Sequence, residues 1–277
     1  MTRLELTLAT APVGALDLSP LTPHALAGMT ADQIRRLRLR HGTRSTPLGD
    51  LFAVNGTAGD VLALRGLTSG CLRAGAGLES GTVEVTGNPG DELGRDMRGG
   101  SIQVRGNVGD GVGLGMQGGL IRVNGSAGDR IGGMLPGATR GMNEGTIIIT
   151  GDAGERVGER MRRGLIVVCG DTGGYTGDRM LAGTIIVLGA CGPHAGAGMR
   201  RGSLLLSERP ATMPATFNPC GAFALTFVPL LAQHLAGIDR RLARRIGDFA
   251  RAERWCGDMA YGGKGEILLA AAAAGAR

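Results

Sequence analysis

The chain has 277 residues, a formal net charge of +6 and a pI near 9.6, and 43% of its residues are hydrophobic. This apolar content excludes a disordered chain, while 52 glycines and only 3% aromatics indicate a core of small aliphatic side chains joined by tight turns. The basic runs at 34–44 and 239–245 lack stacking aromatics and nucleic-acid motifs, so we interpret them as solvated helix faces or protein interfaces and expect no nucleic-acid partner.

The cysteine content and the hydropathy of the chain predict its cellular location. The five cysteines form no CxxC pair and their number is odd, which favours a reduced, intracellular protein. No apolar run approaches the roughly 20 residues that a membrane span needs. We therefore expect a cytoplasmic protein with no membrane partner.

Residues 1–47 are predicted to be a lead-in and cap that contains two short helices. Thr22, before Pro23, has the character of one helix N-cap. Thr30 and Gln33 form a capping-box pattern for the second helix, which we expect to end near Gly42.

Residues 48–209 contain a repeat, which we predict to fold as a parallel β-helix. The opening glycine of each unit recurs every nineteen residues, with one step of twenty-six: Gly81, Gly100, Gly119, Gly145, Gly164, Gly183 and Gly202. Two aliphatic residues follow at alternate positions, as in Ile102 and Val104, which is the period of a strand with one buried face. Further glycine columns and a methionine column recur in register, as expected for coils that stack like on like. The stretch 51–80 resembles degenerate turns of the same coil.

The position between the two inward residues changes character along the repeat. It is polar at Glu84, Gln103 and Arg122, and then apolar at four successive units: Ile148, Val167, Ile186 and Leu205. An apolar outer face of this length needs a cover, which is either the C-terminal segment or another chain. We favour the C-terminal segment and keep the four residues as candidate partner contacts.

The single step of twenty-six marks a seven-residue insertion around residues 135–140. A coil expels an insertion as a surface loop, which is free to specialise or is simply tolerated. We predict that Leu135, Pro136 and Arg140 contact a partner.

Residues 210–277 lose the glycine pattern and are predicted to be a helical extension that packs on the coil. The helical character is clearest at 227–255.

The sequence shows no recognisable catalytic or metal-binding pattern, and we expect no catalytic, cofactor-binding or metal-binding residue in this chain. The four histidines are scattered, and no HExxH, GxSxG or paired CxxC is present. The GxGxxG at 113–118 falls on the repeat glycines, and GGKGE at 262–266 lacks the spacing of a phosphate loop. The acidic column Asp91, Asp110, Asp129 and Glu155 offers a cation site, but we favour side chains that satisfy turn amides.

The GxxGxxxGxxM rhythm of the repeat resembles the β-helix domain that ends the large subunit of glutamate synthase. The flanks LGDLFAVNG (48–56) and WCGDMAYGGKGEILL (255–269) are more specific, and with them nearly the whole chain resembles the C-subunit family of formylmethanofuran dehydrogenases. That family includes a methylotroph branch, the formyltransferase/hydrolase complexes. The abundance of Ala, Arg and Gly over Lys favours this branch.

The resemblance implies a right-handed β-helix that serves as a non-catalytic scaffold of a one-carbon complex. Such a complex transfers formyl from formyl-tetrahydromethanopterin through a methanofuran-type carrier and hydrolyses it to formate. The carrier and zinc are expected in the partner subunits, a hydrolase and a formyltransferase among them, and the assembly is expected to be a hetero-oligomer. The alternatives are the C subunit of a molybdenum or tungsten formylmethanofuran dehydrogenase, a spacer like that of glutamate synthase, or an enzyme active on a lateral face of the coil.

Overall fold

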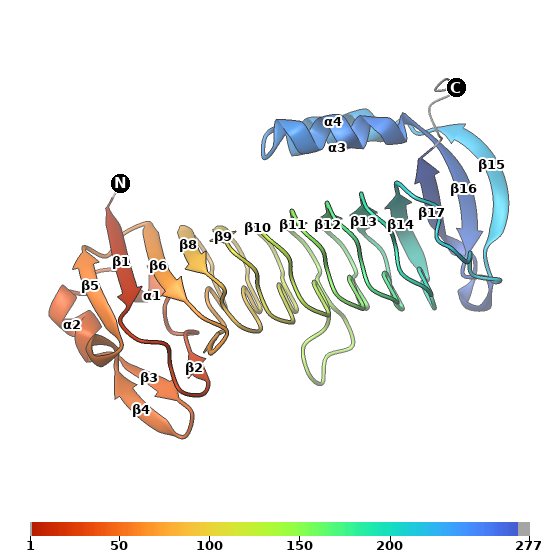
Figure 1. Ribbon diagram of the computed structural model, residues 1–277. Helices are drawn as coiled ribbons and strands as arrows, with labels where there is room; N and C mark the ends of the chain where they lie inside the picture. The colour runs from red at the N-terminus through yellow and green to blue at the C-terminus, as the bar shows by residue number, and fades with distance from the viewer. Residues whose placement is uncertain (1, 271–277) are drawn as a thin grey trace.

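A computed structural model describes residues 2–270 of the chain as a mostly β protein dominated by one long sheet (Figure 1). This sheet has 13 strands among the described residues. In sheet order they are β15 (Asn218–Ala224), β16 (Arg251–Gly257), β17 (Lys264–Ala270), β14 (Arg201–Leu206), β13 (Thr184–Val187), β12 (Leu165–Val168), β11 (Thr146–Ile149), β10 (Leu120–Asn124), β9 (Ser101–Arg105), β8 (Thr82–Gly87), β6 (Val61–Leu67), β1 (Arg3–Leu8) and β5 (Phe52–Gly56). The predicted all-β core is confirmed.

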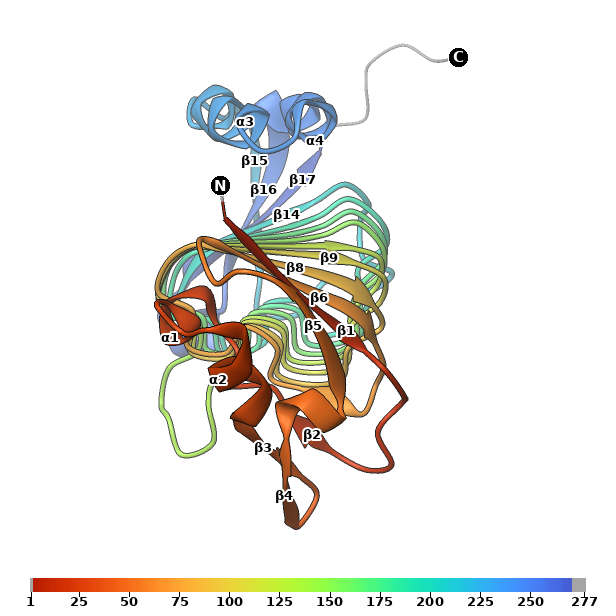
Figure 2. The same cartoon turned by 90° about the vertical axis from the view of Figure 1, so that its left-hand side faces the viewer.

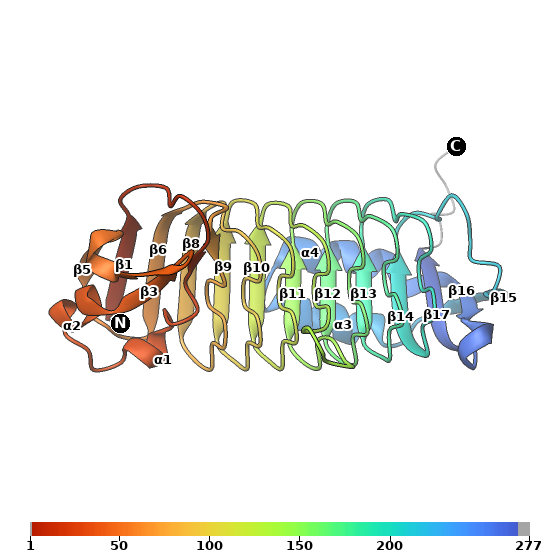
Figure 3. The same cartoon turned by 90° about the horizontal axis from the view of Figure 1, so that it is seen from below.

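Strands β8 to β14 are consecutive in the chain, lie side by side and run parallel. Val83 pairs with Ile102 and Ile102 pairs with Ile121, so equivalent residues nineteen apart face each other across the sheet. The next pair, Ile121 with Ile147, spans the predicted insertion. The loops that join these strands follow one another in step along the molecule (Figure 3).

The inward side chains of these strands form much of the core. The paired positions predicted to face inward are buried, as in Ile102 and Val104, both with no exposed surface. The methionine column is equally buried, at Met97, Met116, Met142, Met161, Met180 and Met199. Because equivalent positions stack one strand spacing apart, each buried side chain packs against its own counterpart in the next unit.

One glycine column shows how tightly the units stack. Gly113 has φ of +65°, and a Cβ added there would lie 2.6 Å from Cδ1 of Ile147 in β11. Glycine is therefore required for two reasons, the left-handed backbone and the absence of space for a side chain.

The N-terminal segment contains the two predicted helices and four strands that the sequence patterns did not indicate. Helix α1 (Pro23–Leu26) is N-capped by Thr22, and α2 (Ala31–Arg36) has the complete capping box of Thr30 and Gln33. Helix α2 ends at Arg36 rather than near Gly42, because the following residues form a hairpin. That hairpin belongs to a small sheet of β4 (Arg44–Pro47), β3 (Arg38–His41), β2 (Leu16–Asp17) and β7 (Cys71–Leu72), and a 3-10 turn, η1 (Leu48–Asp50), follows.

Strand β1 lies between β5 and β6 in the large sheet, antiparallel to β5 and parallel to β6. The lead-in therefore contributes to the sheet itself. In the stretch 51–80, β6 continues the parallel stack with a register shift after Leu64, whereas β5 does not, because it pairs antiparallel with β1.

The C-terminal segment is only partly helical. Helices α3 (Val228–Ala236) and α4 (Arg240–Ile246) lie over the outer face of the large sheet (Figure 2), and they are followed by the turn η2 (Gly247–Ala250). The helical prediction is wrong for residues 251–255, which begin β16. Strand β17 pairs parallel with β14 and antiparallel with β16, so it buries Ile267 in the core and holds β16 in the sheet. The turn η3 (Met259–Tyr261) joins the two strands.

None of the helices formed by residues 2–270 has the length and apolar character that crossing a bilayer requires.

Replacing Gly113 by alanine is expected to lower the free energy of unfolding by about 2–4 kcal/mol, because the left-handed backbone and the clash with Ile147 add. Gly137 is the matched control: its φ is +79°, but nothing lies within 4 Å of an added Cβ. Gly137→Ala should cost only about 1 kcal/mol. Urea unfolding of both variants measures the difference, and equal losses would contradict the packing argument.

Candidate functional site

The apolar half of the outer face is covered by the chain's own helices. Ile148, Val167, Ile186 and Leu205 are each at most 1% exposed. They pack in one cluster with helix residues that include Leu235, Leu242, Ile246 and Phe249. The cover that we favoured from the sequence is the one the structure has. These four side chains are therefore occupied within the chain, and the alternative of another chain lying directly on them is corrected.

The helical cover is attached at its two ends by arginines. Arg122 donates to the carboxylate of Asp239 at 2.6 Å and to the carbonyl of Ile238 at 3.5 Å. Arg245 donates from α4 to the carbonyl of Leu188 at 3.0 Å.

Asp239 joins this attachment to the start of α4. It is the N-cap of that helix and accepts from the backbone amides of Arg241 and Leu242. The hydrogen bond from the Leu242 amide has the largest effect on the pKa of Asp239. Together with the bond from Arg122 it lowers that pKa, against the opposing effect of burial.

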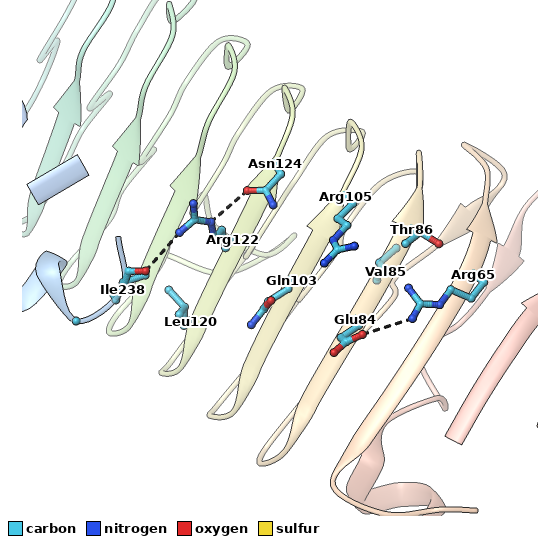
Figure 4. A pocket seen from close by; sticks show the side chains of 11 residues that line it. Arg65, Glu84, Val85, Thr86, Gln103, Arg105, Leu120, Arg122, Asn124 and Ile238 are labelled. Carbon is cyan, nitrogen blue, oxygen red and sulfur yellow. Dashed lines mark hydrogen bonds and ion pairs between the residues drawn. The ribbon is translucent and has the colours of Figure 1, made fainter. Parts of the chain in front are cut away.

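A polar cavity of about 420 Å³ lies beside the point where the helical cover ends (Figure 4). Arg65, Gln103 and Arg122 reach it from neighbouring strands, and Glu84 lies between them. Glu84 is paired with Arg65 at 3.5 Å and with Arg3 at 3.0 Å, and Arg122 donates to Asn124 at 3.1 Å. The lining is mostly polar, with arginine, glutamate, glutamine and asparagine side chains.

The histidines serve separate parts of the structure. His24 lies 3.4 Å from the Thr22 hydroxyl, His41 lies 3.0 Å from the carbonyl of Val13, and His194 stacks on Tyr175 with ring centroids 4.7 Å apart. Within residues 2–270, no group of three or more His, Cys, Asp or Glu side chains is arranged to hold a metal ion.

The acidic column links neighbouring units through their turn amides. Asp91 accepts from the amide of Asp110 at 2.9 Å, Asp110 from Asp129 at 2.9 Å, and Asp129 from Glu155 at 2.8 Å. A second column repeats the arrangement, with Asn88 accepting from the amide of Asn107 at 2.9 Å. The structural interpretation of the acidic residues is confirmed for the three aspartates, each of which satisfies an amide that would otherwise lack a protein partner.

The insertion projects as a loop from the stack (Figure 1). Pro136 and Arg140 are exposed, while Leu135 is half-buried and lies over Gly115. Arg140 and Thr139 line a second cavity, of about 510 Å³, together with arginines of later units. The loop therefore exposes the Pro136 ring and the Arg140 guanidinium beside the second cavity, whose position could not be predicted from the sequence.

Comparison with known proteins identifies relatives over most of the chain. The family model described as GXGXG motif matches residues 49–221. The crystal structure of the formyltransferase/hydrolase complex FhcABCD from Methylorubrum extorquens, solved in complex with methylofuran, contains a chain that superposes with a TM-score of 0.90. The two chains are 37% identical, and the match covers 97% of this chain and 100% of that one.

Two curated relatives match over shorter segments. The C subunit of the formyltransferase/hydrolase complex Fhc of Methylorubrum extorquens strain AM1 is 39% identical over 78 residues, 28% of this chain. The C subunit of the molybdenum-containing formylmethanofuran dehydrogenase 1 of Methanosarcina barkeri is 32% identical over 80 residues, 27% of this chain. The aligned segments span 29% and 27% of the length of these relatives.

Asp110→Ala is expected to lower the free energy of unfolding by about 1 kcal/mol, because the amide of Asp129 loses its acceptor. Asp110→Asn should change it by less than about 0.5 kcal/mol, since Asn88 performs the same task in the neighbouring column. Thermal unfolding with calcium and with a chelator tests the rival interpretation. A melting temperature that rises with calcium in the parent chain but not in Asp110→Ala would favour a cation site.

Acid is expected to loosen the helical cover at the start of α4. Because the pKa of Asp239 is lowered in the folded chain, its contribution is complete above the ordinary value of 3.8 and is lost as pH falls through the lowered value. Hydrogen exchange of residues 228–246, corrected for intrinsic rates, should accelerate below pH 3.8. In Asp239→Asn, which keeps a capping oxygen, exchange should be faster at neutral pH and should change less with acid.

Proposed function

The chain belongs to the GXGXG family and is a homologue of the C subunit of the formyltransferase/hydrolase complex, and on this premise we propose that it is a non-catalytic structural subunit of such a complex. The match over 97% of the chain, which includes both flanks of the repeat, is the observation that carries the proposal. The complex would transfer formyl from formyl-tetrahydromethanopterin through a methanofuran-type carrier and hydrolyse it to formate. The carrier and the zinc chemistry would lie in the partner subunits.

The scaffold role agrees with how the polar groups of this chain are used. Its aspartate columns satisfy turn amides, and several other acids of the N-terminal half are paired with arginines, as Glu92 is with Arg73 and Arg95, each at 2.7 Å. Burial alone would raise the pKa of Glu92, but the two guanidinium groups outweigh it and lower that pKa. Carboxylates held ionised in this way suit structure rather than general acid catalysis.

We further propose that the parallel strands wind as a right-handed β-helix with turns of about 19 residues over 48–209, capped by 1–47 and extended by 210–277. The nineteen-residue register of β8 to β10 and the strong preference for right-handed parallel connections support this winding. The proposal places the complex in the cytoplasm, where the five free cysteines would stay reduced.

The second candidate is the C subunit of a molybdenum formylmethanofuran dehydrogenase, supported by the relative that matches over 80 residues. That relative shares 32% identity over its segment, against 37% identity over nearly the whole chain for the formyltransferase/hydrolase structure. A spacer like that of glutamate synthase does not account for the match of the flanks.

Affinity purification of the tagged chain from its host is expected to bring down a hydrolase and a formyltransferase, with conversion of formyl-tetrahydromethanopterin to formate. Mass spectrometry identifies the partners, and the isolated chain should be inactive. Recovery of molybdopterin and iron–sulfur subunits would favour the second candidate. An active isolated chain would contradict a scaffold role.

The same purification tests the insertion loop, whose Leu135, Pro136 and Arg140 we propose as partner contacts. Deleting residues 134–140 removes seven residues and restores the nineteen-residue spacing of the repeat, so the coil should remain intact. The shortened chain should unfold like the parent yet recover less partner protein. Full recovery would mean that the loop is only a tolerated insertion.

A further inference from the structure

The cavity beside the insertion loop is a strongly basic groove, which we call the arginine groove. Its volume is about 510 Å³, and it lies between the loop and Tyr261 of η3. It is lined by Thr139, Arg140, Arg160, Arg179, Leu181, Gly198, Arg200 and Tyr261. Four lining residues are arginines and none is acidic, so the groove has about four positive charges at neutral pH.

Two of these arginines occupy backbone positions that favour glycine. Arg160, Arg179 and Gly198 are equivalent residues of successive units, nineteen apart. All three have left-handed backbones, with φ of +52°, +50° and +71°. For a residue with a side chain this conformation costs about 1 kcal/mol. Because the units stack, Arg160 and Arg179 lie next to each other in one wall of the arginine groove.

The groove arginines form no salt bridge with an acid of the described chain, unlike the arginines that link acids of the stack. Within residues 2–270, Arg140, Arg160, Arg179 and Arg200 form no salt bridge, whereas Arg73, Arg122 and Arg130 are all paired with carboxylates. The Nε atom of Arg160 is buried and has no hydrogen-bond partner, and its Nη1 reaches only the carbonyl of Thr139 at 3.5 Å. The N–H groups of Arg160 that line the groove can therefore bind an acceptor from outside the chain, whereas the buried Nε cannot.

The buried acids near the groove form their salt bridges and side-chain hydrogen bonds with groups other than the four groove arginines. Glu159 is buried and pairs with Arg130 at 3.3 Å, and Asp178 is buried and lies 3.9 Å from Arg156. Asp258 accepts from the amides of Gly198 at 3.0 Å and Ala260 at 2.9 Å. The positive charge at the surface of the groove is therefore not neutralised by the lining of the groove itself.

We propose that the arginine groove binds a carboxylate-rich segment of a partner subunit, an inference that rests on the complex proposed above. Planar guanidinium groups bind carboxylates through paired hydrogen bonds, and arginine and tyrosine are enriched in protein interfaces. The four positive charges around this one cavity exceed the negative charge of a single small anion. Exposed Arg140 and Tyr261, from segments far apart in the sequence, extend the groove to a surface that a protein segment can cover.

Zero-length crosslinking locates the partner carboxylates directly. Lys264 is the only lysine in the chain, so Arg179→Lys and Arg200→Lys each introduce one new amine while keeping the positive charge. In the purified complex, a carbodiimide should couple that amine to an aspartate or glutamate of a partner, which mass spectrometry identifies. Arg44→Lys, at an exposed position in the distant β4, is the control and should give no such crosslink.

Charge reversal measures how much the contact contributes to assembly. Arg179→Glu with Arg200→Glu should reduce the partner protein recovered with the chain by about tenfold or more, because like charges would then face each other. Arg36→Glu with Arg44→Glu makes the same change of charge at exposed positions away from the groove and should leave recovery unchanged. Equal melting temperatures of the two isolated double variants would show that both are folded.

The outcomes separate this proposal from the proposed function. Full recovery of partners by Arg179→Glu with Arg200→Glu, or crosslinks that stay within the chain, overturns the arginine groove as a docking site and leaves the scaffold role intact. A parent chain that recovers no partner overturns the scaffold role itself. Loss of recovery in the groove variant alone, together with crosslinks to acidic residues of one partner, establishes the site.

Discussion

The structure depends on register-locked stacking, in which each unit of the repeat pairs with the next through equivalent residues. Val83, Ile102 and Ile121 face one another in adjacent strands, so each buried column is built from similar side chains one strand spacing apart. The same constraint favours glycine where the backbones of neighbouring units approach closely, as at Gly106, where an added Cβ would meet the carbonyl oxygen of Gly87. It also explains the ends of the sheet. The pairing becomes antiparallel between β1 and β5 at one end, and between β17 and β16 and then β16 and β15 at the other, which stops the parallel stack.

Because equivalent residues of successive units stack, each outer face consists of columns of such residues. A change of residue type partway along a column therefore creates a distinct surface. The change from Arg122 to Ile148 begins the apolar stripe on which α3 and α4 lie. Arg122 is the last polar residue of that column and pairs with Asp239, at the start of α4. One residue thus ends the polar half of the face and fixes the edge of the helical cover. The seven-residue insertion changes a different face and gives the arginine groove one of its walls.

Much of this organisation could be predicted from the sequence, because the spacing of the repeat indicates both where the strands lie and which residues of adjacent strands pair. The inward residues, the capping box of Thr30 and Gln33, and the cover over Ile148 were all indicated by local patterns. Strand β1 was missed although Leu4 and Leu6 alternate with polar residues, because its partners β5 and β6 are distant in the chain. Strand β16 was missed because pairing with β17 overrides the helical character of its sequence. The arginine groove needed the structure: the spacing of Arg160 and Arg179 is visible in the repeat, but Arg140 and Tyr261 join them only through a loop and a turn.

The use of arginine connects the stability of the stack with its proposed partner. A guanidinium group offers several donors in one plane and can join acids of neighbouring units, which a single ammonium group does less well. Arg73 spans Asp17 at 2.9 Å and Glu92 at 2.7 Å, and Arg156 lies over the ring of Tyr175, which stacks in turn on His194. In these columns the acid or ring that each arginine needs comes from the next unit of the same chain. The columns of Arg160 and Arg200 use the same residue type without such a complement. Because no carboxylate of the described chain forms a salt bridge with these arginines, a carboxylate of another chain would complete these columns in the way that Glu92 completes the column of Arg73.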